Sequence, residues 1–327
     1  MPNPITIHHG SSAKKQFSLL DCPENCNYPI RGLTWDIVEE NGTWMSVQQS
    51  DFFGGHMQIL ELLAEWETEI SFTAQEPAVF MVVMIEGFFR FYQGKKFLSY
   101  AMGGSYYMAY NHPGTAQLRA SAGKHAILLF ALDWESLNLA GHIYPKMEAI
   151  MKRVHEKSQH TIRLPMCGMS RQVIDLWNEV RKIRTNSHVR RGNLSRSVSL
   201  LLMNYHEQLQ QGDIIKDQLS AEIANALIMY IEANYTSYRD VKKSEVARHI
   251  GESDSKIDGY CAIAFRRSLH KHIIDLRMEK ASRLLADTDL SVTTICYKIG
   301  LSKGSYFFRL FSRYFNCTPS EYRKSHR

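Results

Sequence analysis

Two short stretches near the end of the chain repeat one pattern, Glu245-Val-Ala-Arg-His-Ile-Gly-Glu-Ser253 and Thr294-Ile-Cys-Tyr-Lys-Ile-Gly-Leu-Ser302. In both, a β-branched residue and a small residue precede a Gly-x-Ser sequence. An offset of 49 residues aligns the two stretches, and one added residue in the second copy makes the offset 50 further on. The aligned pairs are Val246 with Ile295, Ala247 with Cys296, Ile250 with Ile299, Gly251 with Gly300, Ser253 with Ser302, Ile257 with Phe307, Cys261 with Phe311 and Phe265 with Phe315.

This repeated pattern predicts two helix-turn-helix units, at about 243–265 and 292–315. The small residue, Ala247 or Cys296, lies where a second helix must cross the first one closely. A glycine that can adopt a positive φ then turns the chain, and a serine caps the following helix. The second helices, expected at Asp254–Phe265 and Lys303–Phe315, are the ones that such a unit places in the major groove of DNA.

The second copy has the stronger features for contact with DNA. Ser302 is expected to cap its second helix, and the first turn offers side chains and backbone N–H groups to base edges or phosphates. Arg309 and Arg313 are four residues apart and therefore share one helix face. The apolar side of this helix is expected to consist of Phe307, Phe308, Leu310, Phe311, Tyr314 and Phe315.

These considerations give ten candidate DNA-contacting residues, although a charged residue taken alone is more often part of a solvated helix face. Arg309 is expected to reach a base or a phosphate, and Arg313 a phosphate. The candidates are Ser302, Lys303, Gly304, Ser305, Tyr306, Arg309 and Arg313 in the second unit, and Ser253, Ser255 and Lys256 in the first.

The segment Ser291–Arg323 resembles the C-terminal signature of AraC/XylS-type transcription regulators. Its most specific parts are the Gly–Ser turn, the Ser-Tyr-Phe at 305–307, the Phe four residues later, and the closing Thr-Pro-Ser-Glu-Tyr-Arg at 318–323. Residues 276–285 resemble the helix that joins the two units in that family. The resemblance, strong over about 240–325, implies a DNA-binding regulator whose N-terminal domain binds a small-molecule effector.

The first unit departs from the family pattern more than the second. In the second unit, Asn316 stands where a glycine is usual, Cys296 replaces an alanine and Leu301 a phenylalanine. In the first, Cys261 replaces an aromatic residue and Arg266 a glycine, and Gly259 interrupts the helix at a cost of about 1 kcal/mol relative to alanine. The second helix of the first unit also combines three carboxylates with one cation, so the second unit is expected to supply most of the affinity; these charged residues are Glu252, Asp254, Asp258 and Lys256.

The N-terminal part, residues 1–142, is expected to form a β-rich, cupin-like barrel or a sandwich. Short apolar runs alternate with turn residues, including a hairpin turn at Gln93-Gly94-Lys95. A small barrel can hold one small ligand. The aromatic candidates for its pocket are Phe89, Phe91, Tyr106 and Tyr107; because alternate strand residues face opposite sides, the sequence leaves open which of them point inward.

Residues 143–215 are expected to be helical and to form a linker or dimerisation region, followed by the DNA-binding domain at 216–327. The whole chain is thus expected to be an α+β protein. Apolar residues recur at a four-three-four spacing, which is typical of a contact between two helices. The contact can lie within one chain or between two chains of a homodimer; the residues are Val173, Trp177, Val180 and Arg184, then Leu194, Val198, Leu201 and Tyr205. Residues 185–212 also loosely resemble a branch that senses siderophores such as pyochelin or yersiniabactin.

Charge and composition narrow the function class. All six excess positive charges lie in residues 216–327, which contain 19 Lys and Arg against 13 Asp and Glu. Such an excess is typical of contact with a polyanion. No apolar run approaches the roughly 20 residues of a membrane span, and the N-terminus lacks the pattern of a secretory signal, so a cytoplasmic protein is expected.

No metal site, cofactor or catalytic set is expected. Cys22 and Cys26 could form half of a zinc site, but Cys167 is the only other cysteine in the N-terminal half. The histidines His56, His112 and His125 lack the close pair and the acidic partner of a metal-dependent barrel enzyme. Two alternatives remain beside an effector-responsive homodimeric activator that contacts RNA polymerase: a barrel enzyme tethered to DNA, and a DNA-binding protein without an effector.

Overall fold

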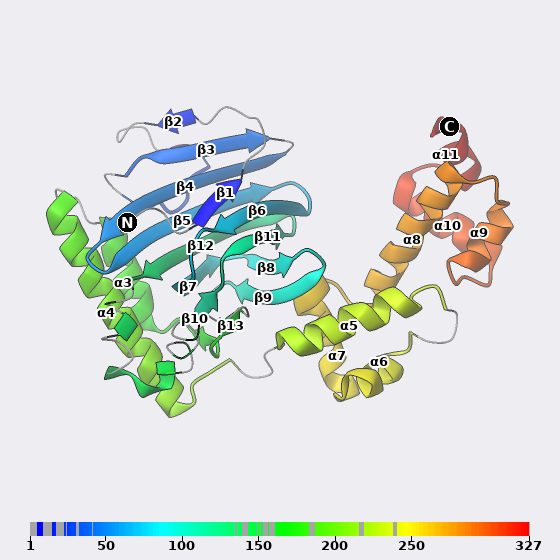
Figure 1. The fold of residues 1–327 in the computed structure, drawn as a ribbon. Coiled ribbons are helices and arrows are strands. Elements are labelled where there is room, and N and C mark those ends of the chain that lie inside the picture. Colours follow the sequence, from blue (N-terminus) through cyan, green and yellow to red (C-terminus); the bar gives the residue numbers. More distant parts are fainter. Residues whose placement is uncertain are drawn as a thin grey trace. The chain divides into compact units, whose positions relative to one another are not determined.

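The computed structural model describes residues 5–8, 15–17, 23, 25–30, 33–40, 42–133, 135, 137–138, 143–148, 150, 152, 156, 161–182, 187–215, 219–237 and 241–326. The chain divides into two compact units, unit 1 (Met1–Gln218) and unit 2 (Leu219–Arg327). Unit 1 combines two antiparallel sheets with helices, and unit 2 is helical throughout the part that is described (Figure 1). The expected α+β class is confirmed.

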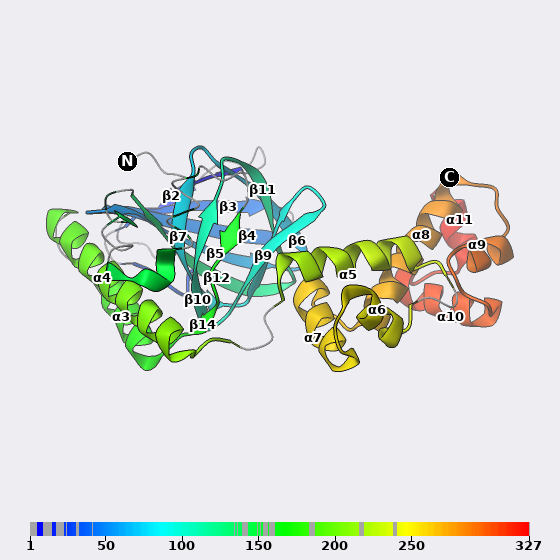
Figure 2. The ribbon, with the colours of Figure 1, turned by 60° about the horizontal axis from the view of Figure 1, so that its bottom comes forward.

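Unit 1 contains two antiparallel sheets that face each other (Figure 2). Sheet A has the strand order β1 (Ile5–His8), β6 (Thr68–Ala74), β11 (Gly114–Ala120), β8 (Phe88–Gln93) and β9 (Lys96–Met102). Sheet B has the order β13 (Ile162–Arg163), β10 (Ser105–Asn111), β7 (Ala78–Glu86), β12 (Gly123–Leu132), β5 (Gly55–Ala64), β4 (Thr43–Phe52), β3 (Trp35–Glu40) and β2 (Lys15–Phe17), and β14 (Cys167–Gly168) also pairs with β10. In the described part of the chain no strand pair joins the two sheets, so this cupin-like arrangement is not a closed barrel.

The central strands of sheet B are covered on both faces. Val82 and Leu129, which are paired across β7 and β12, line a cavity between the sheets. The next pair, Val83 and Leu128, faces the opposite side and meets Trp177 of helix α3 (Arg171–Lys182). Strands buried on both faces are apolar throughout rather than alternating, which explains the continuous apolar runs of β7 and β12.

The helices after the strands belong to unit 1. Helix α4 (Ser187–Gln211) packs against α3 and β4 (Figure 1). It also contacts the short helix η1 (Pro145–Met147), which precedes it in the chain. Seven of the eight expected seam residues are described, and all seven are at most 6% exposed: Val173, Trp177, Val180, Leu194, Val198, Leu201 and Tyr205. The eighth, Arg184, lies outside the described residues. The seam is therefore a contact within one chain, and a dimer would have to use another surface.

A buried polar network fixes α4 to strand β10. The hydroxyl of Tyr106 donates a hydrogen bond to Asn204 Oδ1 at 2.7 Å, and Asn204 Nδ2 donates one to Gln172 Oε1 at 2.7 Å. The hydroxyl of Tyr205 donates to the carbonyl of Pro165 at 2.7 Å. Buried polar groups without such partners would destabilise the fold, so these bonds specify how α4 sits on the sheet.

Unit 2 consists of α5 (Ala221–Asn234), α6 (Lys243–Ile250), α7 (Asp254–Phe265), α8 (Leu269–Asp287), α9 (Val292–Lys298), α10 (Gly304–Phe315) and α11 (Pro319–Ser325). Side-chain oxygens cap several of these helices. Thr318 and Glu321 form a capping box with Pro319 in the first turn of α11, which gives the closing Thr-Pro-Ser-Glu sequence a structural reason. Ser268 caps α8 and Ser291 caps α9 with a single bond each, in which the serine hydroxyl accepts from the backbone N–H three residues on.

The carboxylate of Glu61 anchors the chain before β3 to strand β5. Glu61 is 3% exposed and accepts hydrogen bonds from the Cys26 thiol at 2.9 Å, the Asn27 N–H at 2.7 Å and the Tyr28 N–H at 3.2 Å. We expect Glu61→Ala to lower the free energy of unfolding of unit 1 by about 3 kcal/mol, because two backbone N–H groups lose their acceptor.

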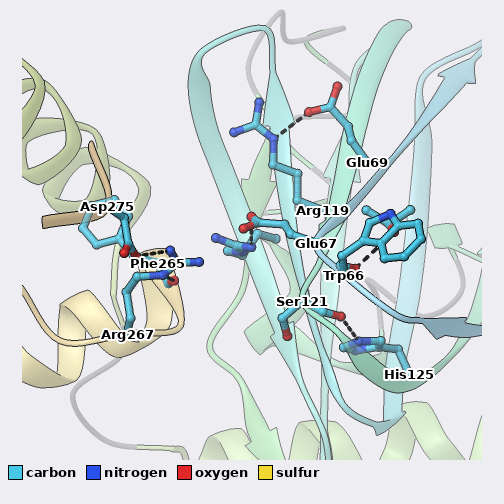
Figure 3. A network of polar contacts seen from close by, with 11 residues as sticks. Trp66, Glu67, Glu69, Arg119, Ser121, His125, Phe265, Arg267 and Asp275 are labelled. Atoms are coloured by element: carbon cyan, nitrogen blue, oxygen red, sulfur yellow. Dashed lines mark hydrogen bonds and ion pairs between the residues drawn. The ribbon is translucent and has the colours of Figure 1, made fainter. Parts of the chain in front are cut away.

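Tryptophan fluorescence during urea unfolding measures this change in the full chain, since all five tryptophans belong to unit 1: Trp35, Trp44, Trp66, Trp134 and Trp177. Glu69→Ala is the matched control. Glu69 forms an ion pair with Arg119 at 2.6 Å, with both side chains more than a third exposed (Figure 3), so its loss should cost less than about 1 kcal/mol. Equal losses for the two variants would show that Glu61 is not an anchor.

Candidate nucleic-acid interface

Each helix-turn-helix unit turns at the glycine that the repeat predicts. Gly251 has φ +73° and Gly300 has φ +81°, both in the left-handed region. The small residues Ala247 and Cys296 are each 2% exposed, as a close helix crossing requires. Among the described residues, only Arg266 and Asn316 combine a side chain with a positive φ, and they stand where the family usually has glycine. Asparagine tolerates this conformation better than arginine does, so the first unit carries the greater backbone strain.

Helix α10 of the second unit packs on a compact apolar core. Phe307 and Phe311 are fully buried and contact α8 and α9 through a cluster that includes Met278, Leu285 and Ile295. Phe311 also meets Tyr322 of α11 at 5.4 Å between ring centroids. These contacts fix which face of α10 remains outside.

Polar contacts between α8 and α10 centre on Asp275. Its carboxylate accepts hydrogen bonds from Arg267, Lys271 and the hydroxyl of Tyr314, and the pair with Arg267 is drawn in Figure 3. Burial opposes ionisation of Asp275, but the three donors outweigh it and hold the pKa of this carboxyl below its ordinary value. The network ties the last turns of α10 to the middle of α8.

The outward face of α10 carries most of the predicted contact residues. Ser302, Lys303, Gly304, Ser305, Arg309 and Arg313 are exposed, and Tyr306 is half-buried. The guanidinium of Arg309 lies 5.7 Å from the centroid of the Tyr306 ring. Residues 290–320 contain four Lys and Arg and no Asp or Glu, so this unit presents an unopposed positive charge. Such a face suits the phosphates and base edges of a nucleic acid.

Two expectations about α10 are wrong. Ser302 does not cap the helix; the cap position belongs to Lys303 and has no side-chain hydrogen bond, because the extra residue after Gly300 moves the helix start to Gly304. Phe308 does not belong to the apolar side, since 41% of it is exposed. It lies between Ser305 and Ser312 on the outward face, and their three-and-four spacing is the signal in the sequence that could have placed it there.

The first helix-turn-helix unit, formed by α6 and α7, presents a different face. Ser253 and Ser255 are exposed, but their hydroxyls bond to each other at 2.9 Å, and Ser253 makes no capping hydrogen bond to α7. Lys256 forms an ion pair with Glu252 at 3.2 Å, and Lys243 one with Asp258 at 2.6 Å. The cations near α7 are thus paired with carboxylates inside the unit, which weakens any attraction to phosphates.

Arg277 on α8 holds the segment that follows α5. Its Nε donates to the carbonyl of Tyr235 at 2.7 Å, and its Nη2 donates to the carbonyl of Ser237 at 3.0 Å. The turn at Gly300 packs against the same place, because a Cβ there would lie 2.4 Å from the carbonyl oxygen of Thr236. Neither contact is visible in the repeat pattern, since the segment after α5 has no counterpart in it.

The two glycines of these units should respond oppositely to alanine. Gly300→Ala should destabilise the second unit by about 2–4 kcal/mol, because it combines a positive φ with a backbone clash. Gly259 lies inside α7 with no atom within 4 Å of an added Cβ, so Gly259→Ala should stabilise its helix by about 1 kcal/mol. Hydrogen exchange of α7 and α10 in the full chain measures both changes, and a neutral Gly300→Ala would contradict the close approach.

Unit 1 contains a second candidate site, the cavity between its sheets. The empty space along it amounts to about 990 Å³, a figure that includes open solvent. Phe91 and Tyr107 line this cavity. Phe89 and Tyr106 do not: Phe89 stacks on His125 at 5.3 Å between centroids, and Tyr106 bonds to Asn204. Alternation separates Tyr106 from Tyr107, which are adjacent on β10. It does not separate Phe89 from Phe91, which are two residues apart on β8 and differ instead in their position along the strand.

The histidines have structural partners or line the cavity. His56 Nδ1 lies 2.9 Å from an oxygen of Asp51, and His125 bonds to the N–H of Phe88 and the carbonyl of Ser121. His112 lines the cavity. In the ranges that the structure describes, no three His, Cys, Asp or Glu side chains come together as metal ligands would. Cys22 lies outside these ranges. In the same ranges, no helix is both long and apolar enough to cross a membrane.

Comparison with known proteins places the repeat in a recognised domain. Residues 246–325 match the family model described as "Helix-turn-helix domain". An uncharacterized HTH-type transcriptional regulator in the cgkA 5′ region of Pseudoalteromonas carrageenovora is 30% identical over 103 residues, which is 32% of this chain and 59% of that protein. Transcriptional activator PerA of Escherichia coli O127:H6 is 27% identical over 117 residues, 34% of this chain and 39% of that protein. The chain thus spans less than two thirds of the length of either relative.

A solved structure is also similar to part of the chain. It is the C-terminal domain of the two-component response regulator yesN from Fusobacterium nucleatum, at 26% identity. The similarity covers 30% of this chain and 95% of that domain, with a TM-score of 0.29.

Proposed function

Because residues 246–325 form a helix-turn-helix domain of the AraC/XylS type, we propose that the chain is a transcription regulator that binds specific DNA sequences and responds to a small molecule held in unit 1. The observation that carries the DNA-binding part is the outward face of α10, which is positively charged and free of carboxylates over residues 290–320. In this proposal α10 enters a major groove, where Ser305, Phe308 and Arg309 meet base edges. Lys303, the first-turn backbone at Gly304, and Arg313 meet phosphates.

The cavity and strand β10 support the effector part of the proposal. Tyr107 on one face of β10 lines the cavity, while Tyr106 on the other face bonds to α4. The segment that pairs with β10 also reaches the end of unit 1, because the N–H of Ile215 donates to the carbonyl of Met166 at 2.8 Å. A ligand that shifts β10 would therefore displace α4 and the chain that leads into unit 2.

Several finer features complete the proposal. The protein works in the cytoplasm by binding and not by catalysis, and it acts as an activator, as the name of the relative PerA states for that protein. It contacts RNA polymerase at its promoters and forms a homodimer. The exposed faces of α3 and α4 remain for such a dimer, since Ile174, Val189 and Met203 are each at least 40% exposed.

Substitution of one cation in each unit tests which unit supplies the affinity. Arg309→Ala should weaken binding to the protein's own operator by about 5- to 150-fold, the equivalent of 1–3 kcal/mol for a lost base contact. Lys256→Ala should weaken it less than about twofold, because its ammonium group already faces Glu252. Fluorescence anisotropy with a labelled operator duplex at fixed salt measures both, after the operator has been selected from random sequence.

The reverse order would show that the first unit dominates recognition, against this proposal. Titration at several salt concentrations adds a second criterion. Lys303→Ala should reduce the slope of log affinity against log salt by about 1, as the loss of one phosphate contact predicts. Lys324→Ala, which changes a cation on α11, serves as the control for net charge.

The exposed ring of Phe308 predicts a preference for thymine in the site. The 5-methyl group of thymine is the apolar feature of the major groove, and aromatic side chains can contact it. Replacing each thymine of the selected operator by deoxyuridine removes only that methyl group. At one position we expect wild-type binding to weaken by about 3- to 10-fold, the lower part of the range for base discrimination, and Phe308→Ala to be insensitive to the same replacement. Sensitivity that persists in Phe308→Ala would assign the methyl contact to another residue.

A further inference from the structure

We propose that the cavity between the sheets of unit 1 binds an uncharged, largely apolar molecule that offers one hydrogen-bonding group to Gln58. This inference rests on the proposed function, because it names the chemical class of the effector. Three observations carry it: the side chains that line the cavity, the position of Gln58, and the absence of charge from the described lining residues.

Both sheets contribute apolar side chains to the cavity. Leu60, Val82 and Leu129 project from sheet B, and Ile70, Phe72 and Phe91 project from sheet A. The rings of Phe72 and Phe91 meet edge to face, with 6.2 Å between their centroids. Ligand sites with such a lining gain most of their affinity from burial of apolar ligand surface.

Gln58 is a polar side chain deep in this lining. It is 5% exposed, and in the described part of the chain its side chain forms no hydrogen bond. Its position two residues before Leu60 on β5 places both side chains on the cavity face of the strand. A polar side chain that lines the cavity without a protein partner is suited to bonding with a guest molecule.

The described lining of the cavity lacks the charged side chains that would hold an ion. None of its described lining residues is Asp, Glu, Lys or Arg. Arg163 stacks on the ring of Tyr107 at 5.5 Å but is not part of the lining. A buried charge requires a partner. A charged iron–siderophore complex is therefore disfavoured as the occupant.

The more exposed polar groups mark where a guest enters. Gln93 and Thr115 are exposed lining residues, and Asn111 and His112 beside them are half-buried. All four lie at or next to the ends of β8, β10 and β11. A guest would enter with its apolar part first and leave any further polar group at this end.

Two dyes that differ by one charge test the proposal in the full chain. N-phenyl-1-naphthylamine is uncharged, and 8-anilinonaphthalene-1-sulfonate is the same molecule with an added sulfonate. We expect the uncharged dye to bind at one saturable site with enhanced fluorescence, and the sulfonate to bind at least tenfold more weakly. Equal binding of the two dyes, or no saturable site for the uncharged dye, would overturn the proposal.

Cavity variants locate the bound dye. Ala109→Phe fills space in the lining and should weaken binding of the uncharged dye by at least tenfold, and Ala109→Leu replaces it if the larger side chain prevents folding. Ala262→Phe, on the exposed face of α7, is the matched control and should bind the dye as the wild type does. Wild-type binding by a folded Ala109 variant would place the dye elsewhere and reject the cavity.

Gln58→Leu tests the unpaired amide. Without a guest, this variant should raise the thermal midpoint of unit 1, followed by tryptophan fluorescence, by roughly 2–4 °C, because an unpartnered polar group is removed. A lowered midpoint would show that Gln58 has a structural bond and would reject its role. Operator binding by the same preparations distinguishes failure of the ligand proposal from failure of the proposed function. If the protein binds DNA but the dye experiments fail, only the ligand class is rejected. If the wild type shows no specific DNA binding, the proposed function is rejected.

Discussion

Helix α8 has to complete two helix-turn-helix units with one continuous set of side chains. Its first turns bury Leu269 and Ile273, and its later turns bury Met278 and Leu285 in the core of the second unit. At 19 residues α8 is about 28 Å long, so it acts as a rigid spacer between the two helix-turn-helix units. Any change that bends this helix would alter the spacing of the two units, whatever the state of their own cores.

Polar contacts in the middle of α8 make the spacer specific. The carboxylate of Asp275 accepts hydrogen bonds from Arg267, which precedes α8, from Lys271 on α8 and from Tyr314 on α10. Arg277 donates to backbone carbonyls of the segment after α5. Asp275 and Arg277 are less than one helical turn apart. The same short stretch of α8 therefore holds both α10 and the segment that follows α5. The orientation of α10 thus depends on buried and half-buried bonds as well as on aromatic packing.

The two helix-turn-helix units differ in backbone conformation and in charge. Arg266 adopts a conformation that favours glycine, Gly259 weakens α7, and the cations near α7 are paired with carboxylates. The second unit has asparagine at the corresponding turn and a face without carboxylates. In the proposed function, the first helix-turn-helix unit supports α8 and makes weaker contacts with DNA than the second.

In unit 1, double coverage of sheet B links the cavity to the helices. The cavity-lining residues Val82, Leu129 and Tyr107 have the outward neighbours Val83, Leu128 and Tyr106, which face α3 or α4. Protein interiors are densely packed, so a guest that displaced one face of such a strand would move the other. In the proposed function, this arrangement would couple occupancy of the cavity to the end of unit 1.

The sequence by itself determined the two helix-turn-helix units, because glycine turns, small crossing residues and apolar spacing are local requirements that repeat at a fixed offset. It also determined the β-rich start of the chain and the basic C-terminal part. Tertiary structure alone decided which side of β8 and β10 faces inward, since alternation defines two faces without assigning either. It alone decided that the helical seam packs within the chain, that Phe308 points outward, and that Gln58 lines the cavity between the sheets. Each of these depends on what another segment covers, and residues far apart in sequence meet only once the chain has folded.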